Sequence, residues 1–274
     1  MKKTAVITGG GGVLCSAFAE QMAKDGYQVA VLDLNPDAAK STADAICQNG
    51  GVAKAYQANV LDKENLKAVH RAVLSDFGRC DVLINGAGGN NPRCTTEHET
   101  FMPGDEVNEE IKTFFNLEQS GFEFVFNLNL MGTLLPTQVF AVDMIEQNKG
   151  CILNVSSMNA FRPLTKIPAY SAAKSAVSNF TQWLAVHFAK QNIRVNAIAP
   201  GFFVTNQNRA LLFNADGTPT PRTGKILNAT PMGRFGEPEE LLGTLRWLTD
   251  EKASGFVTGI VVPVDGGFSA YSGV

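Results

Sequence analysis

The sequence lacks any run of lysine or arginine, and charged residues make up only 18% of its 274 residues. With a formal net charge of −3, it offers no basic stretch for a phosphate backbone, so we expect no nucleic-acid partner. Hydrophobic residues reach 45%, which argues against disorder and predicts a soluble protein with a large core.

Paired cysteines and clustered histidines are also missing. The five cysteines are odd in number and scattered, with no Cys-x-x-Cys spacing, which indicates neither a disulfide framework nor a zinc site. The three histidines are dispersed in the same way, and we expect no metal. The cysteines are Cys15, Cys47, Cys80, Cys94 and Cys151.

Long hydrophobic runs are a third absence. No segment reaches the ~20 consecutive apolar residues of a membrane span. The start, Met-Lys-Lys, leads directly into a short strand without a small-residue cleavage site. We therefore expect no membrane association and a cytoplasmic location.

Apolar strands alternate with amphipathic helices along the chain. This alternation predicts an α/β fold, a Rossmann-type doubly wound parallel sheet of about seven strands with helices on both faces, in a single domain over residues 1–274. Two stretches near 88–119 and 202–236 interrupt it, and because loops this long are usually functional, we expect them to enclose the substrate. The predicted strands are 4–8, 27–34, 52–57, 81–85, 151–156, 194–198 and 260–264, and the predicted helices are 13–25, 36–48, 63–77, one ending near 148, and 170–191.

A glycine-rich turn, Thr8 to Gly12, follows the first strand. Such a turn lets backbone N–H groups approach a pyrophosphate at a helix N-terminus, although a plain tight turn explains the glycines equally well. Asp33 ends the second strand, where a carboxylate accepts hydrogen bonds from ribose hydroxyls and repels a 2′-phosphate. This placement favours NAD over NADP, whereas the alternative is that Asp33 only begins a turn.

Tyr170 and Lys174 lie four residues apart in a predicted helix and so share one of its faces. The ammonium is expected to lower a phenol pKa that starts near ~10, which makes Tyr170 a candidate proton donor and acceptor. Ser157 precedes this pair at the end of a predicted strand and could hydrogen-bond the same substrate oxygen.

Taken in order, these motifs resemble the short-chain dehydrogenase/reductase superfamily along the whole chain. Thr8 and Gly9 match the start of its Thr-Gly-x-x-x-Gly-x-Gly turn, whereas Val13 and Cys15 stand where the later glycines are expected. The glycines between them can supply the missing backbone freedom. The resemblance implies a hydride-transfer enzyme with a small-molecule substrate, a nicotinamide cofactor and a homotetrameric assembly.

Three further motifs extend the resemblance on the cofactor side. Asn-Gly-Ala-Gly at 85–88 is similar to the family's Asn-Asn-Ala-Gly, Asn59-Val60 stands where the family has Asp-Val beside the adenine, and 200–205 matches Pro-Gly-x-x-x-Thr, whose threonine binds the carboxamide. The resemblance therefore implies cofactor contacts at Thr8, Gly9, Gly11, Gly12, Val13, Leu14, Asp33, Asn59, Val60, Asn85, Ala87, Gly88, Tyr170, Lys174, Pro200, Gly201, Phe203 and Thr205.

The same resemblance implies a catalytic set of four residues. Asn129 begins Asn-Leu-Met-Gly, the family's Asn-x-x-Gly, whose backbone holds a water in a proton relay with the lysine. Ser157, and not Ser156, has the family's spacing to the tyrosine. The set is Asn129, Ser157, Tyr170 and Lys174.

Amides and guanidiniums near the two interruptions suit a hydroxyl-rich anion, because arginine binds a carboxylate in bidentate fashion. Surface ion pairs explain these arginines equally well. Stretches 86–93, 208–214 and 230–236 are similar to the D-mannonate oxidoreductase (fructuronate reductase) branch, which implies D-fructuronate and D-mannonate as the reacting pair. The candidate substrate residues are Asn90, Arg93, Ser157, Asn159, Arg162 and Arg209, with Asn206 and Gln207 beside the last.

Two alternatives stay open at this point. One is a gluconate-type or polyol-type dehydrogenase of the same superfamily. The other is a catalytically silent nucleotide-binding regulatory protein, which the replaced glycines favour and the intact catalytic set opposes.

Overall fold

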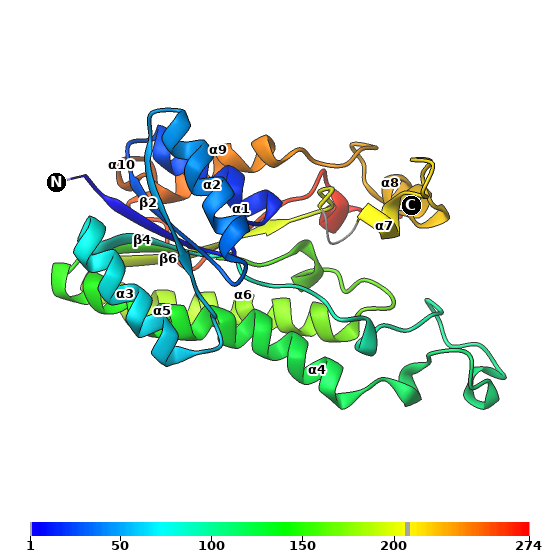
Figure 1. Cartoon of the computed structure of the whole chain (residues 1–274). Helices are drawn as coiled ribbons and strands as arrows, with labels where there is room; N and C mark the ends of the chain where they lie inside the picture. The colour runs from blue at the N-terminus through cyan, green and yellow to red at the C-terminus, as the bar shows by residue number, and fades with distance from the viewer. Residues whose placement is uncertain (1, 206–208, 274) are drawn as a thin grey trace.

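The structure, a computed structural model, describes residues 2–205 and 209–273. Its centre is a sheet of seven parallel strands in the order β3-β2-β1-β4-β5-β6-β7 (Figure 1). This confirms the predicted Rossmann-type α/β fold. Because β1 lies between β2 and β4, the strand order reverses there and opens a crevice at the carboxyl ends of the strands. The strands are β1 (Thr4–Thr8), β2 (Gln28–Asp33), β3 (Val52–Gln57), β4 (Cys80–Asn85), β5 (Gly150–Val155), β6 (Ile193–Pro200) and β7 (Val261–Val264).

Helices cover both faces of the sheet (Figure 1). Two of them begin where the sequence predicts, because a side chain caps each start. Asn35 accepts hydrogen bonds from two N–H groups in the first turn of its helix, and Asp62 does the same. The main helices are α1 (Val13–Lys24), α2 (Pro36–Gln48), α3 (Lys63–Phe77), α4 (Gln119–Phe126), α5 (Gly132–Gln147), α6 (Pro168–Phe188), α9 (Leu242–Thr249) and α10 (Glu251–Ser254).

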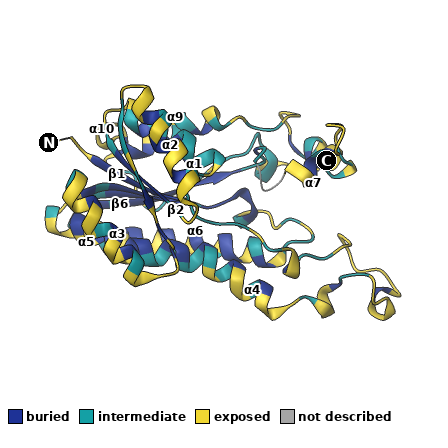
Figure 2. Ribbon diagram, in the orientation of Figure 1, coloured by how far each residue is buried: buried dark blue, intermediate teal, exposed yellow. Residues whose placement is uncertain are grey.

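The hydrophobic core has two parts, one on each face of the sheet, and the sheet between them is buried (Figure 2). Phe18 of α1 and Leu245 of α9 belong to the first part. Phe140 of α5 and Leu184 of α6 belong to the second. Each central strand therefore has apolar side chains on both faces, which is why the strands are continuous apolar runs in the sequence.

One helical stretch, Gln119–Gln147, is long and apolar enough to cross a membrane by length and composition alone, which the sequence prediction did not identify. Half of its most apolar window is buried in the fold. Phe140 and Met144 of this stretch are fully buried in the core beside the sheet. Packing against the sheet therefore accounts for its apolar composition.

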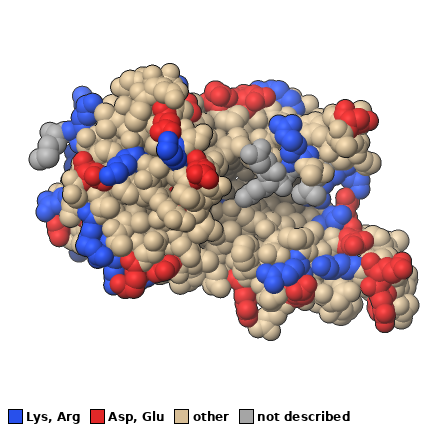
Figure 3. All heavy atoms as spheres, viewed as in Figure 1, with Lys and Arg blue, Asp and Glu red and all other residues tan. Residues whose placement is uncertain are grey.

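The two predicted interruptions both extend from the carboxyl end of the sheet, and the surface is hollowed between them (Figures 1 and 3). The first contains three short 3-10 turns, η1 (Pro92–Cys94), η2 (Asp105–Val107) and η3 (Phe114–Asn116). The second, expected as a loop, contains helices α7 (Arg209–Leu212) and α8 (Pro221–Ala229). We did not predict α8, although Thr220 and Pro221 are favourable residues for a helix start.

Candidate active site

The glycine turn after β1 packs closely against two neighbouring segments. Gly9 has a φ of +66°, and a Cβ there would lie 3.0 Å from the backbone nitrogen of Ala87. Gly11 packs in the same way on α2, since its Cβ would meet the Ala38 backbone at 2.8 Å. The turn therefore needs glycine at both positions, for conformation at the first and for space at both.

Helix α1 begins beside this turn with an uncapped N-terminus. Gly12 is its N-cap in an extended conformation and offers no side-chain hydrogen bond. The N–H groups of Val13 and Leu14 have no partner within the helix, as at every helix start. An exposed glycine followed by such N–H groups has the chemistry of a phosphate site, so these residues fit a dinucleotide.

Asp33 lies directly next to the turn, where it ends β2. One carboxylate oxygen accepts a hydrogen bond from the N–H of Gly11 at 3.0 Å, and the other accepts from the N–H of Asn35 at 2.9 Å. Asp33 therefore both closes a turn and places a negative charge at the edge of the predicted cofactor site. The two interpretations of this residue are compatible.

The loop that follows β4 is held to the end of β1. Thr8 Oγ1 accepts hydrogen bonds from the N–H groups of Gly86 and Ala87, at 3.1 and 3.3 Å. The side chain of Asn85, a predicted cofactor residue, is buried and donates to Thr137 and Asn154 at 3.0 and 2.9 Å. Its amide nitrogen therefore joins β4 to β5 and α5 inside the fold.

Other predicted cofactor residues follow the carboxyl ends of β3 and β6. The Asn59 side-chain oxygen accepts from the N–H of Leu61 at 3.0 Å, and Val60 is buried. Gly201 follows Pro200, the last residue of β6, and a Cβ there would lie 2.6 Å from Asp265. Two further predicted residues follow it, the buried Phe203 and the partly exposed Thr205.

Tyr170 lies in the first turn of α6, beside Ser157, which follows the last residue of β5 by two positions. Burial raises the pKa of the Tyr170 phenol, and a hydrogen bond with the Ser157 side chain acts in the opposite direction. We expected a lowered pKa for this phenol, whereas in the structure its pKa is raised. The Lys174 ammonium lies over the Tyr170 ring, 5.7 Å from its centre, and is bonded elsewhere.

Lys174 is buried one helical turn further along α6. Its Nζ donates a hydrogen bond to the carbonyl of Val155 at 2.8 Å. Burial lowers the pKa of Lys174 from 10.5 to about 8. The lysine is therefore close to titrating in the physiological range, which is typical of functional sites.

The structure also distinguishes the two adjacent serines. Ser156 is buried, and its hydroxyl bonds to the carbonyl of Lys174 and to the hydroxyl of Ser178 at 2.7 Å. Ser157 Oγ accepts from the N–H of Asn159 at 3.3 Å and contacts Tyr170. Ser156 thus fastens β5 to α6, which leaves Ser157 as the serine at the phenol.

Asn129 lies in a π-helical turn, η4 (Asn127–Met131), between α4 and α5. Its side chain donates to the carbonyl of Gly89 at 2.8 Å and accepts from the N–H of Gly89 at 3.3 Å. A Cβ on Gly88 would lie 2.7 Å from Asn129 Oδ1 and 3.1 Å from Lys174 Nζ. The loop after β4 therefore brings Asn129 and Lys174 together, and π-turns of this kind are frequent at functional sites.

The predicted substrate arginines are held in different ways. Arg93 is exposed and donates to Asn91 and Ser120, while Arg162 donates to the carbonyl of Ser269 at 3.1 Å. Arg209 is exposed at the start of α7. Within residues 2–205 and 209–273, none of these three arginines forms an ion pair with a carboxylate.

Two amides of the predicted substrate set lie at the same end of the sheet. Asn159 is buried beside Ser157, and its Oδ1 has no hydrogen-bond partner in the described part of the chain. Asn90 is exposed and donates to Thr95 at 3.2 Å. Asn206 and Gln207 lie outside the described residues.

The sequence prediction missed a contact that joins the two insertions. Lys225 of α8 bonds to both carboxylate oxygens of Glu99 in the first insertion, at 2.9 and 3.0 Å. Lys166, which has a φ of +75°, accepts at its carbonyl from the N–H of Thr96. No local pattern reveals such contacts, because the partners are far apart in the sequence.

Comparison with known proteins gives one family along most of this chain. The model of the short chain dehydrogenase family matches residues 3–214. A crystal structure from Haemophilus influenzae with bound NAD, provisionally described as a D-mannonate oxidoreductase, has 62% sequence identity, covers 99% of this chain and 96% of its own, and has a TM-score of 0.95.

Two proteins of Bacillus subtilis are also similar. The uncharacterized oxidoreductase UxuB is 53% identical, over 99% of this chain and 96% of its own length. Glucose 1-dehydrogenase 2 is 33% identical, over 98% of this chain and 95% of its own length.

Proposed function

This chain belongs to the short-chain dehydrogenase family, and from that premise we propose that it is an NAD(H)-dependent oxidoreductase of a sugar acid. The reaction interconverts a keto acid and its hydroxy acid, with D-fructuronate and D-mannonate as the pair. The observation that supports this most directly is the contact of Ser157 with the Tyr170 phenol, one helical turn from the buried Lys174.

The cofactor lies, in this proposal, along the carboxyl ends of β1, β2, β4 and β6. The uncapped N-terminus of α1 and the glycine turn before it fit a pyrophosphate. Asp33 lies next to this turn, where the adenosine ribose would bind. Lys174 would hydrogen-bond the nicotinamide ribose and Thr205 the carboxamide. When bound, the nicotinamide supplies the hydride for reduction and accepts it in oxidation.

The protein's own groups handle the proton. Tyr170 donates its phenolic proton to the carbonyl oxygen of the substrate during reduction and takes it back during oxidation. Ser157 donates a hydrogen bond to the same oxygen and stabilises its developing negative charge. Lys174 and the backbone of Asn129 belong to the path that returns a proton to Tyr170.

We further propose a preference for NAD over NADP. The Asp33 carboxylate is fixed by two backbone N–H groups, so it cannot easily turn away from a nearby ligand. A 2′-phosphate next to it would meet like charge at short range. The bound NAD in the Haemophilus influenzae structure agrees with this preference.

The two insertions enclose the substrate in this proposal. The buried Asn159 Oδ1 offers an acceptor to a substrate hydroxyl beside Ser157. Arg93, Arg162 and Arg209 are the candidate partners for a carboxylate, because none of them pairs with a carboxylate among residues 2–205 and 209–273 and each could bind an anionic ligand. The Glu99–Lys225 ion pair joins the two insertions and, in this proposal, limits how far they separate.

We propose a cytoplasmic homotetramer as the working form. The basis for this proposed assembly and location is the family resemblance. Equilibrium sedimentation of the purified protein measures the assembly directly.

A panel of keto acids, uronates and neutral sugars with NADH and with NADPH tests the proposed function. We expect D-fructuronate to be reduced far better than D-fructose, because losing the anion leaves a desolvated guanidinium unpaired. Comparable kcat/KM for the acid and its neutral analogue would overturn the sugar-acid proposal. NADPH that binds as tightly as NADH would overturn the cofactor preference alone.

The second candidate is a gluconate-, glucose- or polyol-type dehydrogenase. The 33% identity with glucose 1-dehydrogenase 2 over nearly the whole chain favours it. Good activity on a neutral polyol or aldose, together with none on uronates, would select this candidate.

A further inference from the structure

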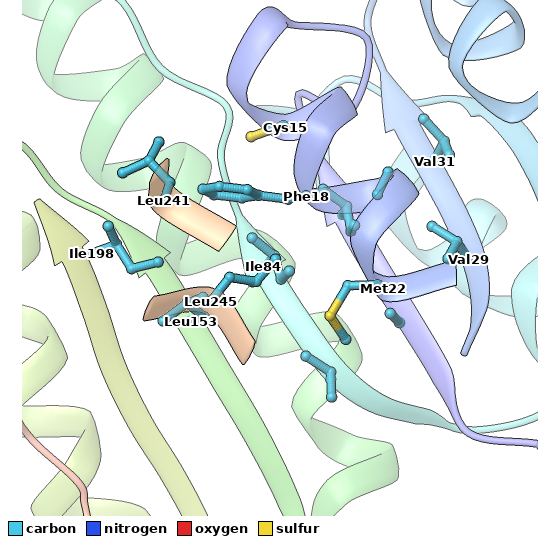
Figure 4. Close-up of a cluster of buried hydrophobic side chains, with 14 of the residues drawn as sticks. Cys15, Phe18, Met22, Val29, Val31, Ile84, Leu153, Ile198, Leu241 and Leu245 are labelled. Atoms are coloured by element: carbon cyan, nitrogen blue, oxygen red, sulfur yellow. The ribbon is translucent and has the colours of Figure 1, made fainter. Parts of the chain in front are cut away.

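Cys15 stands in the first turn of α1, at a position where the glycine pattern leads one to expect glycine. It is 4% exposed and belongs to the core cluster that includes Phe18 one turn further along (Figure 4). Burial raises the pKa of its thiol to about 12, with Lys174 and Asp33 near enough to act on it. The thiol is thus a neutral packing group underneath the candidate site.

Gly86 lies opposite this sulfur, in the loop after β4. A Cβ on Gly86 would overlap the sulfur of Cys15, far inside the 3.0 Å that real Cβ atoms keep, and would lie 2.9 Å from the carbonyl of Thr8. The φ of Gly86 is not in the left-handed region, so its backbone conformation does not demand glycine. The Cys15 sulfur is the nearest atom that a Cβ at position 86 would meet, and the Thr8 carbonyl is the second.

We propose that Cys15 and Gly86 form a reciprocal pair in which the cysteine replaces the missing glycine of the turn and the glycine makes room for it. The pair sets the distance between the glycine turn and the loop after β4. Gly86 is the positioning residue for the cofactor and, through the loop, for the proton path, whereas Cys15 determines how much space remains at position 86. This inference rests on the proposed use of the site for NAD(H).

The loop after β4 connects Gly86 both to β1 and to Lys174 and Asn129. On one side, Thr8 Oγ1 accepts from the N–H groups of Gly86 and Ala87, so a shifted loop loses bonds to β1. On the other side, Gly88 fits against Lys174 Nζ with no room for a Cβ, and Gly89 bonds to Asn129 through both backbone groups. A displaced Gly86 therefore disturbs cofactor contacts and proton path together.

Three variants test the pair: Gly86→Ala, Cys15→Ala and the double variant. In the double variant the two Cβ atoms would lie 3.6 Å apart, an ordinary van der Waals distance. The Cβ at position 86 still lies 2.9 Å from the carbonyl of Thr8, so the loop must also move away from that carbonyl. The added methyl then occupies part of the volume that the sulfur leaves.

We expect Gly86→Ala alone to weaken NADH binding by at least about tenfold and to lower kcat, and Cys15→Ala alone to change either by less than about threefold. The double variant should return to within about threefold of wild type in both. NADH fluorescence titration measures the dissociation constant, steady-state kinetics gives kcat, and thermal unfolding reports stability separately. A purely structural role would change the melting temperature but leave the dissociation constant of the folded protein unaltered.

Gly51 provides a matched control, because a Cβ there would also be crowded, at 2.6 Å from the Ile46 side chain and away from the turn. The fold-changes that Gly51→Ala and Cys15→Ala cause in the NADH dissociation constant and in kcat should multiply in the double variant, as for independent sites. If the fold-changes caused by Gly86→Ala and Cys15→Ala also multiply, the two residues are independent and the proposed pair is refuted.

The double variant still tests the pair if Gly86→Ala alone does not fold. A double variant that folds and binds NADH then supports the pair, and one that does not fold overturns it. Failure of the wild type to bind either nicotinamide cofactor would instead refute the proposed function. The melting temperatures of the double variant and its parents would still decide whether the two residues are coupled.

Discussion

Replacing Lys174 by methionine should change the stability of the protein in a way that depends on pH. The lysine is 4% exposed, and burial lowers its pKa from 10.5 to about 8. A lysine whose folded pKa is depressed binds its proton less tightly in the folded state than in the unfolded state. Its charge therefore destabilises the fold fully below pH 8, and this cost disappears as the pH rises toward the unfolded value near ~10.4.

The size of the effect follows from the two pKa values. A fall from 10.5 to about 8 corresponds to a cost of about 3 kcal/mol at pH 7, because each pKa unit is worth about 1.4 kcal/mol. At pH 9 the folded state has lost most of the proton, and about 2 kcal/mol of the cost remains. Wild type should therefore gain about 1 kcal/mol relative to Lys174→Met between these two pH values. Lost packing and the lost bond to Val155 do not titrate, so they cancel in this comparison.

Urea unfolding of wild type and Lys174→Met at pH 7 and pH 9 measures the difference. Lys190→Met is the control, because Lys190 is exposed in the turn η6 (Ala189–Gln191) directly after α6. The control should show no comparable pH trend. A stability difference between wild type and Lys174→Met that is equal at both pH values would refute the argument from burial.

Four further outcomes are expected. Tyr170→Phe should lower kcat at least ~100-fold while fluorescence titration finds NADH binding nearly unchanged, and near-normal turnover would assign the proton to another group. Ser157→Ala should lower kcat more than Ser156→Ala does, and equal losses would contradict the assignment of the serine at the phenol. Asp33→Asn should reduce the ratio of NADPH to NADH dissociation constants, because the repelling charge is gone; an unchanged ratio leaves Asp33 as a turn residue. Lys225→Met, which breaks the ion pair between the insertions, should raise the KM for the substrate without altering NADH affinity, and an unchanged KM would separate this contact from substrate closure.

Much of the fold was predictable because local signals agree with the tertiary structure. The strand predicted at 4–8 is β1, and the helices predicted at 36–48 and 63–77 are α2 and α3. A β-branched run that ends in glycines defines the strand, and the caps Asn35 and Asp62 define the starts of the two helices.

The second insertion shows where local signals are insufficient. Helix α8 has nine residues, and only two of its side chains, Thr223 and Ile226, are buried. An isolated helix of this length is marginal in water, so its formation depends on contacts with the rest of the fold. One such contact is Lys225 with Glu99, which is 126 residues away in the sequence.

Within the site, the order of the motifs was predictable and the electrostatics were not. The spacing of the motifs was enough to predict that Ser157, Tyr170 and Lys174 lie close together, because the carboxyl ends of parallel strands meet at one edge of the sheet. Spacing could not show that the ammonium bonds to the Val155 carbonyl and lies over the Tyr170 ring. The direction of a pKa depends on such distances and on burial, and neither is visible in a sequence.

The corrected pKa of Tyr170 has a chemical consequence. Since burial raises the pKa of the phenol, Tyr170 keeps its proton at neutral pH. The protonated phenol is the form that reduction consumes, whereas oxidation needs the phenolate to accept a proton from the hydroxy acid. Lys174, with a pKa of about 8, is still mostly charged at neutral pH, and its ammonium lies over the Tyr170 ring. The candidate catalytic groups therefore carry the protons that the proposed reduction of a keto acid requires.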